Sequence, residues 1–352
     1  MGEFDLQQWE VEGTIISPLH IGSGESLDPF RIVQRGDMVY EFDLSMVLNE
    51  AHPDDRSELE RTLSQPEVNP DFVVKKLREI VKEKHFIPGR SYKLASNVQI
   101  KEDMSGEDIM LFSYNTLTGE RIVPGSSLKG ALRTGMIADR EPRDFRPSGS
   151  PIQRAQGLEK AAMRYNKIDE DPFGEWYVSD AVIDADFFLG GVSTHHRLGT
   201  MTPPIPNIFE MAQYNYEKPA FNVIFNHRKR KRARGRFNLN EWLKAVNKNT
   251  QRAFDEAYPY DKDPPGSFPI GTADNQEKIY DKIEACQDSS DSCVVRLGRF
   301  SGYLAMTVEN QRSLQKRTRG WLRGKQADPL TRVLTSDGWP MGFVKLKFNR
   351  KI

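Results

Sequence analysis

Glycine-rich turns that follow predicted strands constrain this chain most strongly, because each turn fixes where an extended segment stops. One follows a strand over 8–16, a second follows 121–123, and a third follows 294–297. Glycine tolerates positive φ angles and has no Cβ, so such turns can bring backbone N–H groups close to a ligand. The pattern fits short strands separated by helices and long loops.

The rest of the chain alternates between helical and extended patterns. The segments with helical spacing are 56–63, 71–84, 128–136, 240–258 and 275–287. The other extended segments are a hairpin over 31–43 and strands over 176–188, 220–225 and 342–348. Loops are predicted at 142–151, from 190 through 206, and at 261–271. We therefore predict the α+β class, with an N-terminal domain over 1–200 and a C-terminal domain over 201–352.

Composition and the N-terminal residues argue against a membrane protein. Of the 352 residues, 38% are hydrophobic and 28% charged, and the mean hydropathy is −0.62. No apolar run approaches the ~18 residues that a membrane span needs. Residues 1–12 contain four acidic side chains and no Lys or Arg, unlike a secretory signal. We expect a cytoplasmic protein without membrane partners.

Cysteine and histidine usage gives no indication of a metal site or cofactor. The two cysteines, Cys286 and Cys293, lie in an acidic, serine-rich stretch and support neither a disulfide framework nor a thiolate zinc site. The six histidines never fall into a metal-ligand spacing. We expect no metal and no cofactor.

Charge is balanced overall but unevenly distributed. Fifty basic and fifty acidic residues cancel, yet 296–352 has thirteen basic and three acidic residues, and 254–291 has ten acidic and three basic ones. Such segregation predicts one face that attracts polyanions, with RNA or DNA as the natural candidate. Any single run could also be an ordinary solvated face.

The stretch Pro124–Arg133 combines a strand end, a tight turn and a helix start. Ser126 or Ser127 is expected to cap the helix, leaving its first N–H groups for an anion. Lys129 and Arg133 lie one turn apart beside the buried stripe of Leu128, Leu132 and Met136, so a cationic face is expected. The candidate contacts are Gly125, Ser126, Ser127, Lys129 and Arg133. An ordinary capped helix is equally compatible, and the pattern is not a Walker A loop.

The first and third glycine turns give further candidate contacts. Around 296–303, guanidinium groups, glycines and aromatic rings suit a single strand whose bases stack and whose phosphates pair with Arg. A glycine-rich hairpin with Phe300 in the core is the alternative. The candidates from both turns are His20, Gly22, Ser23, Gly24, Arg296, Arg299, Ser301 and Gly302.

Two other features are less specific. Arg228–Arg236 has seven basic residues in nine and is expected to be an exposed arm that senses phosphate more than bases. Asp28 could approach a scissile phosphate if RNA passes over the first turn, although a lone exposed Asp usually forms turns.

Five segments together resemble the RAMP superfamily of CRISPR-associated proteins. They are His20–Glu25, Pro124–Arg133, Phe173-Gly174 with Val178–Ala181, Arg296–Gly302 and Pro340–Phe343. The resemblance implies a ferredoxin-like, RRM-type core with inserted helices and long loops, divided into two subdomains. The aromatic RNP signatures of true RRM proteins are absent, which favours contacts with the RNA backbone over base stacking.

Motif order and chain length resemble the Csm subunit that caps the 3′ end of CRISPR RNA in type III-A effector complexes. That resemblance implies a non-catalytic, RNA-binding role in 3′-end maturation. The implied partners are CRISPR RNA, the backbone and small Csm subunits, and trimming nucleases. Two alternatives stay open: a repeating backbone or handle-binding RAMP subunit, and a RAMP-type endoribonuclease that uses His20 as general acid or base.

Overall fold

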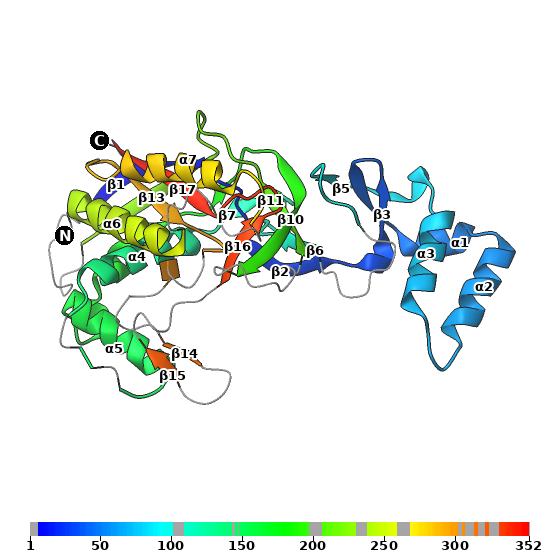
Figure 1. The fold of residues 1–352 in the computed structure, drawn as a ribbon, viewed down its shortest axis with the longest axis horizontal. Helices are drawn as coiled ribbons and strands as arrows, with labels where there is room; N and C mark the ends of the chain where they lie inside the picture. The colour runs from blue at the N-terminus through cyan, green and yellow to red at the C-terminus, as the bar shows by residue number, and fades with distance from the viewer. Residues whose placement is uncertain are drawn as a thin grey trace, which may run out of the picture.

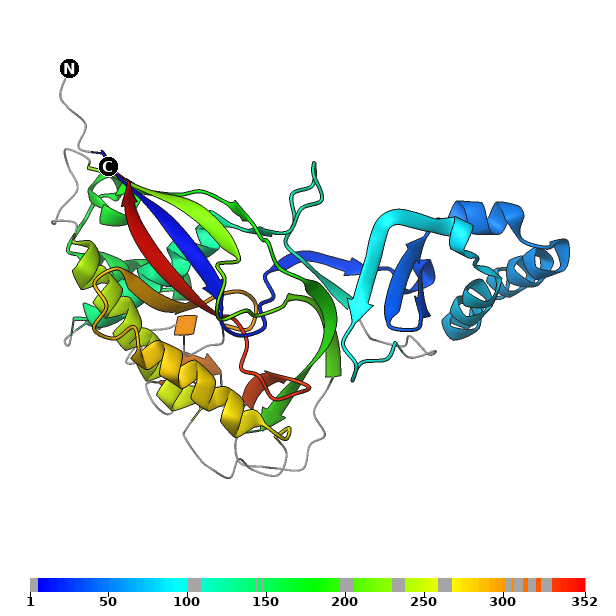
Figure 2. The ribbon, with the colours of Figure 1, turned by 90° about the horizontal axis from the view of Figure 1, so that it is seen from above.

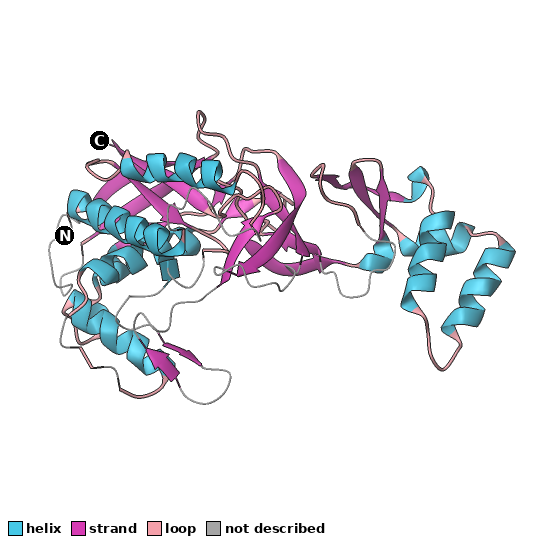
Figure 3. Cartoon of the chain, in the orientation of Figure 1, coloured by secondary structure: helices cyan, strands magenta, loops and turns pink. Residues whose placement is uncertain are grey.

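The structure is a computed structural model in which helices and strands are mixed along the whole chain (Figure 1). It describes residues 6–100, 109–142, 145–146, 148–196, 206–229, 238–258, 268–301, 305–306, 313–315, 321–323 and 331–351. The molecule is elongated, with a large body that contains the first and the last described strands and a smaller helical lobe (Figures 1 and 3). The predicted α+β class is confirmed.

A five-stranded antiparallel sheet forms the centre of the body, in the order β13-β17-β1-β12-β8. Its strands are β1 (Leu6–Ile15), β8 (Trp176–Val178), β12 (Phe221–Arg228), β13 (Ser292–Arg296) and β17 (Phe343–Lys351). β1 lies between β12 and β17, with Val11 opposite Val223 on one side and Phe348 on the other (Figure 2). The sheet therefore joins segments from both ends of the chain.

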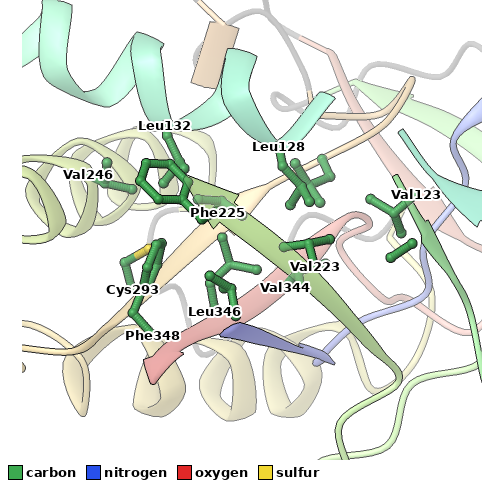
Figure 4. Packing of buried hydrophobic residues seen from close by; sticks show 14 of the residues in the cluster. Val123, Leu128, Leu132, Val223, Phe225, Val246, Cys293, Val344, Leu346 and Phe348 are labelled. Carbon is green, nitrogen blue, oxygen red and sulfur yellow. The ribbon is translucent and has the colours of Figure 1, made fainter. Parts of the chain in front are cut away.

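Two helices cover one face of this sheet and complete its core. α4 (Gly125–Asp139) packs on α6 (Leu239–Ala257), and Leu128, Leu132 and Val246 meet the buried residues of the strands (Figure 4). In chain order, β1, α4, β8, β12, α6 and β17 form the βαββαβ arrangement of ferredoxin-like folds. β13 adds a fifth strand beside β17.

Two more helices flank this unit. α5 (Pro151–Met163) lies beside α4, and α7 (Thr272–Glu284) lies beside α6. Ile279 and Ile283 of α7 belong to a second apolar cluster that also contains Phe254, Val294 and Trp339. These clusters are large enough to hold the body together by apolar burial.

A second sheet runs β2-β6-β11-β10-β5-β4-β3, with β16 paired to β10. Its strands are β2 (Gly22–Leu27), β3 (Ile32–Arg35), β4 (Met38–Phe42), β5 (Phe86–Leu94), β6 (Ile109–Phe112), β10 (Phe187–His196), β11 (Pro206–Ala212) and β16 (Thr331–Thr335). β5 and β10 pair in parallel over two residue pairs only, Lys93 with Phe188 and Leu94 with Leu189. This short pairing connects the lobe to the body.

The lobe consists of α1 (Leu44–Glu50), α2 (Pro53–Leu63) and α3 (Pro70–Ile80) on the β3–β4 hairpin. Asp43 and Asn69 cap α1 and α3 through their side chains, and α2 and α3 each begin with proline. Caps and a first-turn proline are what start helices at these positions. Val33, Phe42 and Leu77 belong to the lobe's own apolar cluster.

The remaining elements are short. The strand pairs are β7 (Ile122–Val123) with β9 (Ala181–Val182), and β14 (Ser313–Gln315) with β15 (Trp321–Arg323). The 3-10 turns are η1 (Pro29–Arg31), η2 (Glu83–His85), η3 (Ile168–Glu170) and η4 (Pro172–Glu175). No helix within the described ranges is both long and apolar enough to cross a membrane.

Several predicted elements differ from the observed ones. The strand expected over 176–188 is divided into β8, β9 and the start of β10, and Asp180, between β8 and β9, accepts a hydrogen bond from the Gly125 N–H at the start of α4. The loop expected from 190 is strand β10 up to His196. The predicted boundary at 200 falls between β10 and β11, which are hydrogen-bonded neighbours, and both sheets use strands from either side of it. A division there does not separate one sheet from the other.

Candidate functional site

The second glycine turn lies at the start of α4. The predicted serine caps are wrong: Pro124 occupies the cap position, and Ser126 and Ser127 lie inside the first turn. The Asp180 carboxylate instead accepts a hydrogen bond from the Gly125 N–H at 2.8 Å. A Cβ at Gly125 would collide with the Val178 carbonyl oxygen, so glycine is needed for this approach. The protein thus places its own anion at the positive helix end.

Lys129 and Arg133 lie one turn apart on α4, but both reach protein groups. Lys129 Nζ donates to the Trp176 carbonyl at 2.9 Å. Arg133 forms an ion pair with Glu159 of α5, and its guanidinium lies 5.2 Å from the centroid of the Phe173 ring. Both cations of the expected cationic face therefore tie α4 to its neighbours, and their contact with RNA stays a prediction.

His20 is a buried side chain, with 1% of its surface exposed. Its Nδ1 lies 2.7 Å from the Glu210 carbonyl oxygen, which can only accept, so Nδ1 carries the proton. Rings of Phe112, Phe209 and Phe300 surround it. Burial lowers the pKa of His20 to about 4, with the Arg299 charge acting in the same direction. The imidazole is neutral at physiological pH and does not face solvent.

The first and third glycine turns meet at the backbone of His20. The Arg299 N–H donates to the His20 carbonyl at 3.2 Å. Gly298 has φ +82°, and a Cβ there would collide with the same carbonyl oxygen, so only glycine fits without displacement. We call Pro18–Gly24 together with Leu297–Ser301 the glycine junction.

The Pro340–Phe343 segment closes the glycine junction from a third side. Gly342 N–H donates to the Pro18 carbonyl at 2.9 Å, and the Leu297 N–H donates to the Gly342 carbonyl at 2.7 Å. Three segments that lie far apart in sequence are thus joined by backbone hydrogen bonds. The glycine motifs of the sequence therefore mark the place where these three segments meet.

Two predicted contacts in the third turn face inward. Arg296 donates to the Tyr258 hydroxyl at 2.7 Å and to the Met341 carbonyl at 2.9 Å, and it lies over the Phe343 ring. Ser301 is buried, and its hydroxyl donates to the Gly298 carbonyl at 2.8 Å. Both residues shape the turn. Gly302 lies outside the described residues.

Gly22, Ser23 and Gly24 form an exposed edge and not the tight turn that we expected. They begin β2, the edge strand of the second sheet, whose pairing with β6 shifts register between Gly22 and Ser26. The Ser23 hydroxyl donates to the Leu111 carbonyl, and Gly24 has φ +89° with open space around it. A bulged edge leaves backbone N–H groups directed away from the sheet.

Arg299 is the predicted cation that the structure leaves available. Its side chain is exposed, its guanidinium lies 6.0 Å from the centroid of the Phe209 ring, and it has no carboxylate partner in the described part of the chain. Its backbone N–H holds it beside His20, two residues from Gly22. Backbone N–H groups next to a guanidinium form an environment suited to a phosphate.

The remaining candidates have structural assignments or lie outside the described residues. Asp28 is exposed and caps η1 by accepting from the Phe30 N–H at 2.9 Å. In the basic arm, Arg228 and Lys229 are described and exposed, and 230–236 lie outside the described residues. Burial raises the pKa of the free thiols Cys286 and Cys293. Within the described ranges, no group of three or more His, Cys, Asp or Glu could hold a metal ion.

Sequence reasoning missed the residues that position these segments. Glu210 accepts from Arg121 Nε at 2.9 Å and from the Phe112 N–H at 2.9 Å, while its carbonyl holds His20. No local pattern marks Glu210. Asp180 did carry a signal, since it lies in the Val178–Ala181 motif, but its role as the cap of α4 requires the fold.

Comparison with known families identifies the class of protein to which the ferredoxin-like unit and the converging glycine turns belong. The model of the RAMP superfamily matches residues 12–285. The chain therefore belongs to the RAMP superfamily, which confirms the resemblance. No curated protein matches it by sequence.

Two solved structures are similar over nearly the whole chain. One is a chain of the cryo-EM structure of a Csm-crRNA-target RNA ternary complex of a type III-A CRISPR-Cas system, with 19% identity, a TM-score of 0.62, and 97% of this chain and 100% of that chain covered. The other is Csm5 of T. onnurineus, with 18% identity, a TM-score of 0.51, and coverage of 95% and 99%. At these identities the likeness concerns the fold.

Proposed function

We propose that this protein is a non-catalytic RNA-binding subunit of a type III-A CRISPR (Csm) ribonucleoprotein. In this role it binds the 3′ region of CRISPR RNA, contacts the backbone and small subunits, and supports 3′-end maturation by trimming nucleases. Membership of the RAMP superfamily and end-to-end likeness to a chain of a Csm-crRNA-target RNA complex support the proposal.

The observation that carries the proposal is the open side of the glycine junction. Gly22–Glu25 is an exposed, bulged edge, and the backbone of Arg299 is hydrogen-bonded to His20, two residues before that edge. The Arg299 side chain is exposed, with its guanidinium 6.0 Å from the centroid of the Phe209 ring. Phosphate oxygens accept hydrogen bonds from backbone N–H groups and guanidinium without regard to base identity. Such a surface suits a guide RNA whose sequence varies.

The non-catalytic part of the proposal rests on the two residues that could have done chemistry. His20, the candidate general acid or base, is buried, neutral and hydrogen-bonded to a carbonyl. Asp28, the candidate for cleavage, uses its carboxylate as a cap. A general acid or base must come within hydrogen-bond reach of the group that it serves. The burial of His20 therefore supports a binding role.

Copurification and a protection assay test the proposal together. We expect the tagged chain, expressed with its cellular partners, to recover Csm subunits and CRISPR RNA. In the recovered particle, the RNA 3′ end should resist a 3′ exonuclease, and particles lacking this chain should lose that protection. Protection at the 5′ end instead would favour a handle-binding subunit. Cleavage of labelled repeat RNA that is abolished by His20→Ala would favour the endoribonuclease.

A further inference from the structure

A cavity of about 500 Å³ lies beside β10 and β11, between the turns at 95–97 and 335–337. These strands lie at the end of the body that faces the lobe (Figure 1). Pockets for organic ligands measure roughly 300–1,000 Å³. The cavity is large enough for one nucleoside. Gly190 and Gly191 line it, and Met211 and Ser336 occupy the space that a Cβ at either glycine would take.

Aromatic rings form part of the cavity wall. Phe187, Phe188 and Tyr214 line it. Phe187 is held edge-on by Phe112 at a centroid distance of 5.2 Å, and Tyr214 packs on Trp339 at 4.5 Å. Rings fixed by neighbours can stack a base without losing further freedom, and stacking contributes ~1–3 kcal/mol per base.

Uncommitted polar side chains line the same space. They are Ser96, Asn97, Gln213 and Ser336. None of the four uses its side chain to hydrogen-bond another residue in the described ranges. Together they offer both donors and acceptors, which is what the edges of a base and a ribose require.

The charges of the lining favour a base over a phosphate in the interior. Lys93 is exposed beside Phe188 and has no ion pair with a described residue. Asp186 and Asp337 add two carboxylates, and Asp337 accepts from the Thr335 hydroxyl. The two carboxylates repel a phosphate from the interior, and the ammonium group of Lys93 attracts one to the exposed position that it occupies.

We propose that this cavity is a nucleoside pocket that takes one unpaired base of the bound RNA strand, with the adjacent phosphate at Lys93. The inference rests on the proposed RNA-binding function and adds a base-binding subsite to it. A smaller cavity of about 200 Å³ shares Phe187 and Phe188 with the first and is also lined by Arg121. The RNA strand can continue along β10 into this second cavity.

The test uses the full chain with single-stranded RNA that carries 4-thiouridine, followed by ultraviolet crosslinking and peptide mapping. We expect crosslinks at Phe187, Phe188 or Tyr214. Phe188→Leu keeps apolar volume but removes the ring, and it should weaken RNA affinity about 5- to 20-fold. The pair Asn97→Ala with Gln213→Ala should weaken it about 3- to 10-fold. Gln65→Ala, an exposed amide at the far end of the lobe, is the matched control and should bind as wild type.

The outcomes separate the pocket from the proposed function. Wild-type affinity in both pocket variants, with crosslinks elsewhere, would overturn the pocket and leave RNA binding intact. Absence of RNA binding by the wild-type chain would remove the proposed function itself. If uridine monophosphate binds as tightly as the RNA, the cavity is a site for free nucleotides. That result would overturn the proposal that an RNA strand supplies the base. If the pocket variants lose affinity for an arginine-rich peptide but retain their affinity for RNA, the cavity binds a protein partner and the nucleoside pocket is overturned.

Discussion

The start of α4 and the glycine junction carry similar sequence signals but use them differently. Both combine glycine with Arg or Lys after a strand. At α4, Asp180 and Glu159 engage the helix end and Arg133, so the segment is closed by protein. At the glycine junction, the backbone of three segments is joined, while Arg299 and the edge of β2 face outward. Partners from distant segments, and not the motif, decide whether a cation is available to a ligand.

The largest expected effect tests how tightly the glycine junction is closed. The substitution Gly298→Ala places an alanine at a positive φ, with a Cβ that overlaps the His20 carbonyl oxygen. We expect a loss of about 3 kcal/mol in the free energy of unfolding, since both strain and overpacking contribute. Gly24→Ala has a similar φ but open space, so about 1 kcal/mol is expected. Urea denaturation measures both, and equal losses would contradict the close approach.

The next test concerns the closed region. Arg133→Ala leaves the largely buried Glu159 without its ion pair, although the guanidinium itself is 36% exposed. Allowing for solvent screening, we expect a loss of about 2 kcal/mol in unfolding free energy. A double-mutant cycle with Glu159→Ala isolates the coupling. The contact with RNA predicted for Arg133 would also reduce the slope of log affinity against log salt by ~0.7. An unchanged slope would show that Arg133 serves the fold alone.

A pH titration examines the buried side of the glycine junction. The unfolded chain protonates His20 near pH 6.5, and the folded protein only near pH 4. The unfolded state therefore binds more protons in this window, so the stability from neutral His20 is complete above pH 6.5 and is lost as the pH falls toward 4. Linkage gives roughly 2 kcal/mol between pH 6.5 and 5.

Urea midpoints at pH 7 and pH 5 measure this effect. His20→Asn retains a donor for the Glu210 carbonyl but cannot titrate, so its pH dependence should be smaller by about that amount. The same pH dependence in both proteins would mean that other groups cause it.

The smallest expected effect concerns the open side of the glycine junction. Arg299→Ala should leave stability near the wild-type value and reduce the slope of log affinity against log salt by ~0.7, as loss of one single-strand phosphate contact predicts. Lys75→Ala on α3 removes one exposed charge from the lobe and is the matched control. Equal slopes in the two variants would show that Arg299 does not contact phosphate.

Periodicity predicted the elements whose burial pattern is local. β1, α6 and the β3–β4 hairpin were placed within a few residues because one face of each is buried and the spacing records it. α5 was missed, although the capping box of Ser150 and Gln153 marks its start, because it follows a proline- and glycine-rich loop.

The candidate site was predictable only in part, because sequence patterns record local burial and not contacts between distant residues. Glycine positions are visible in sequence, but the partners that close α4 lie 55 residues from Gly125 and 26 residues from Arg133. Glu210 lies 190 residues from His20. No window of sequence contains both members of such a pair, so exposure of a cation could not be judged before the fold was known.

The position of β1 between β12 and β17 has a consequence for synthesis in the cell. Asn349 hydrogen-bonds to Glu12 across 337 residues of chain. At roughly 5–20 residues per second, the ribosome needs about 20–70 s after making β1 before it makes β17. During that interval one edge of β1 lacks its hydrogen-bonding partner, and unpaired strand edges promote aggregation. A chain that stops before β17 therefore leaves one edge of β1 without its neighbouring strand.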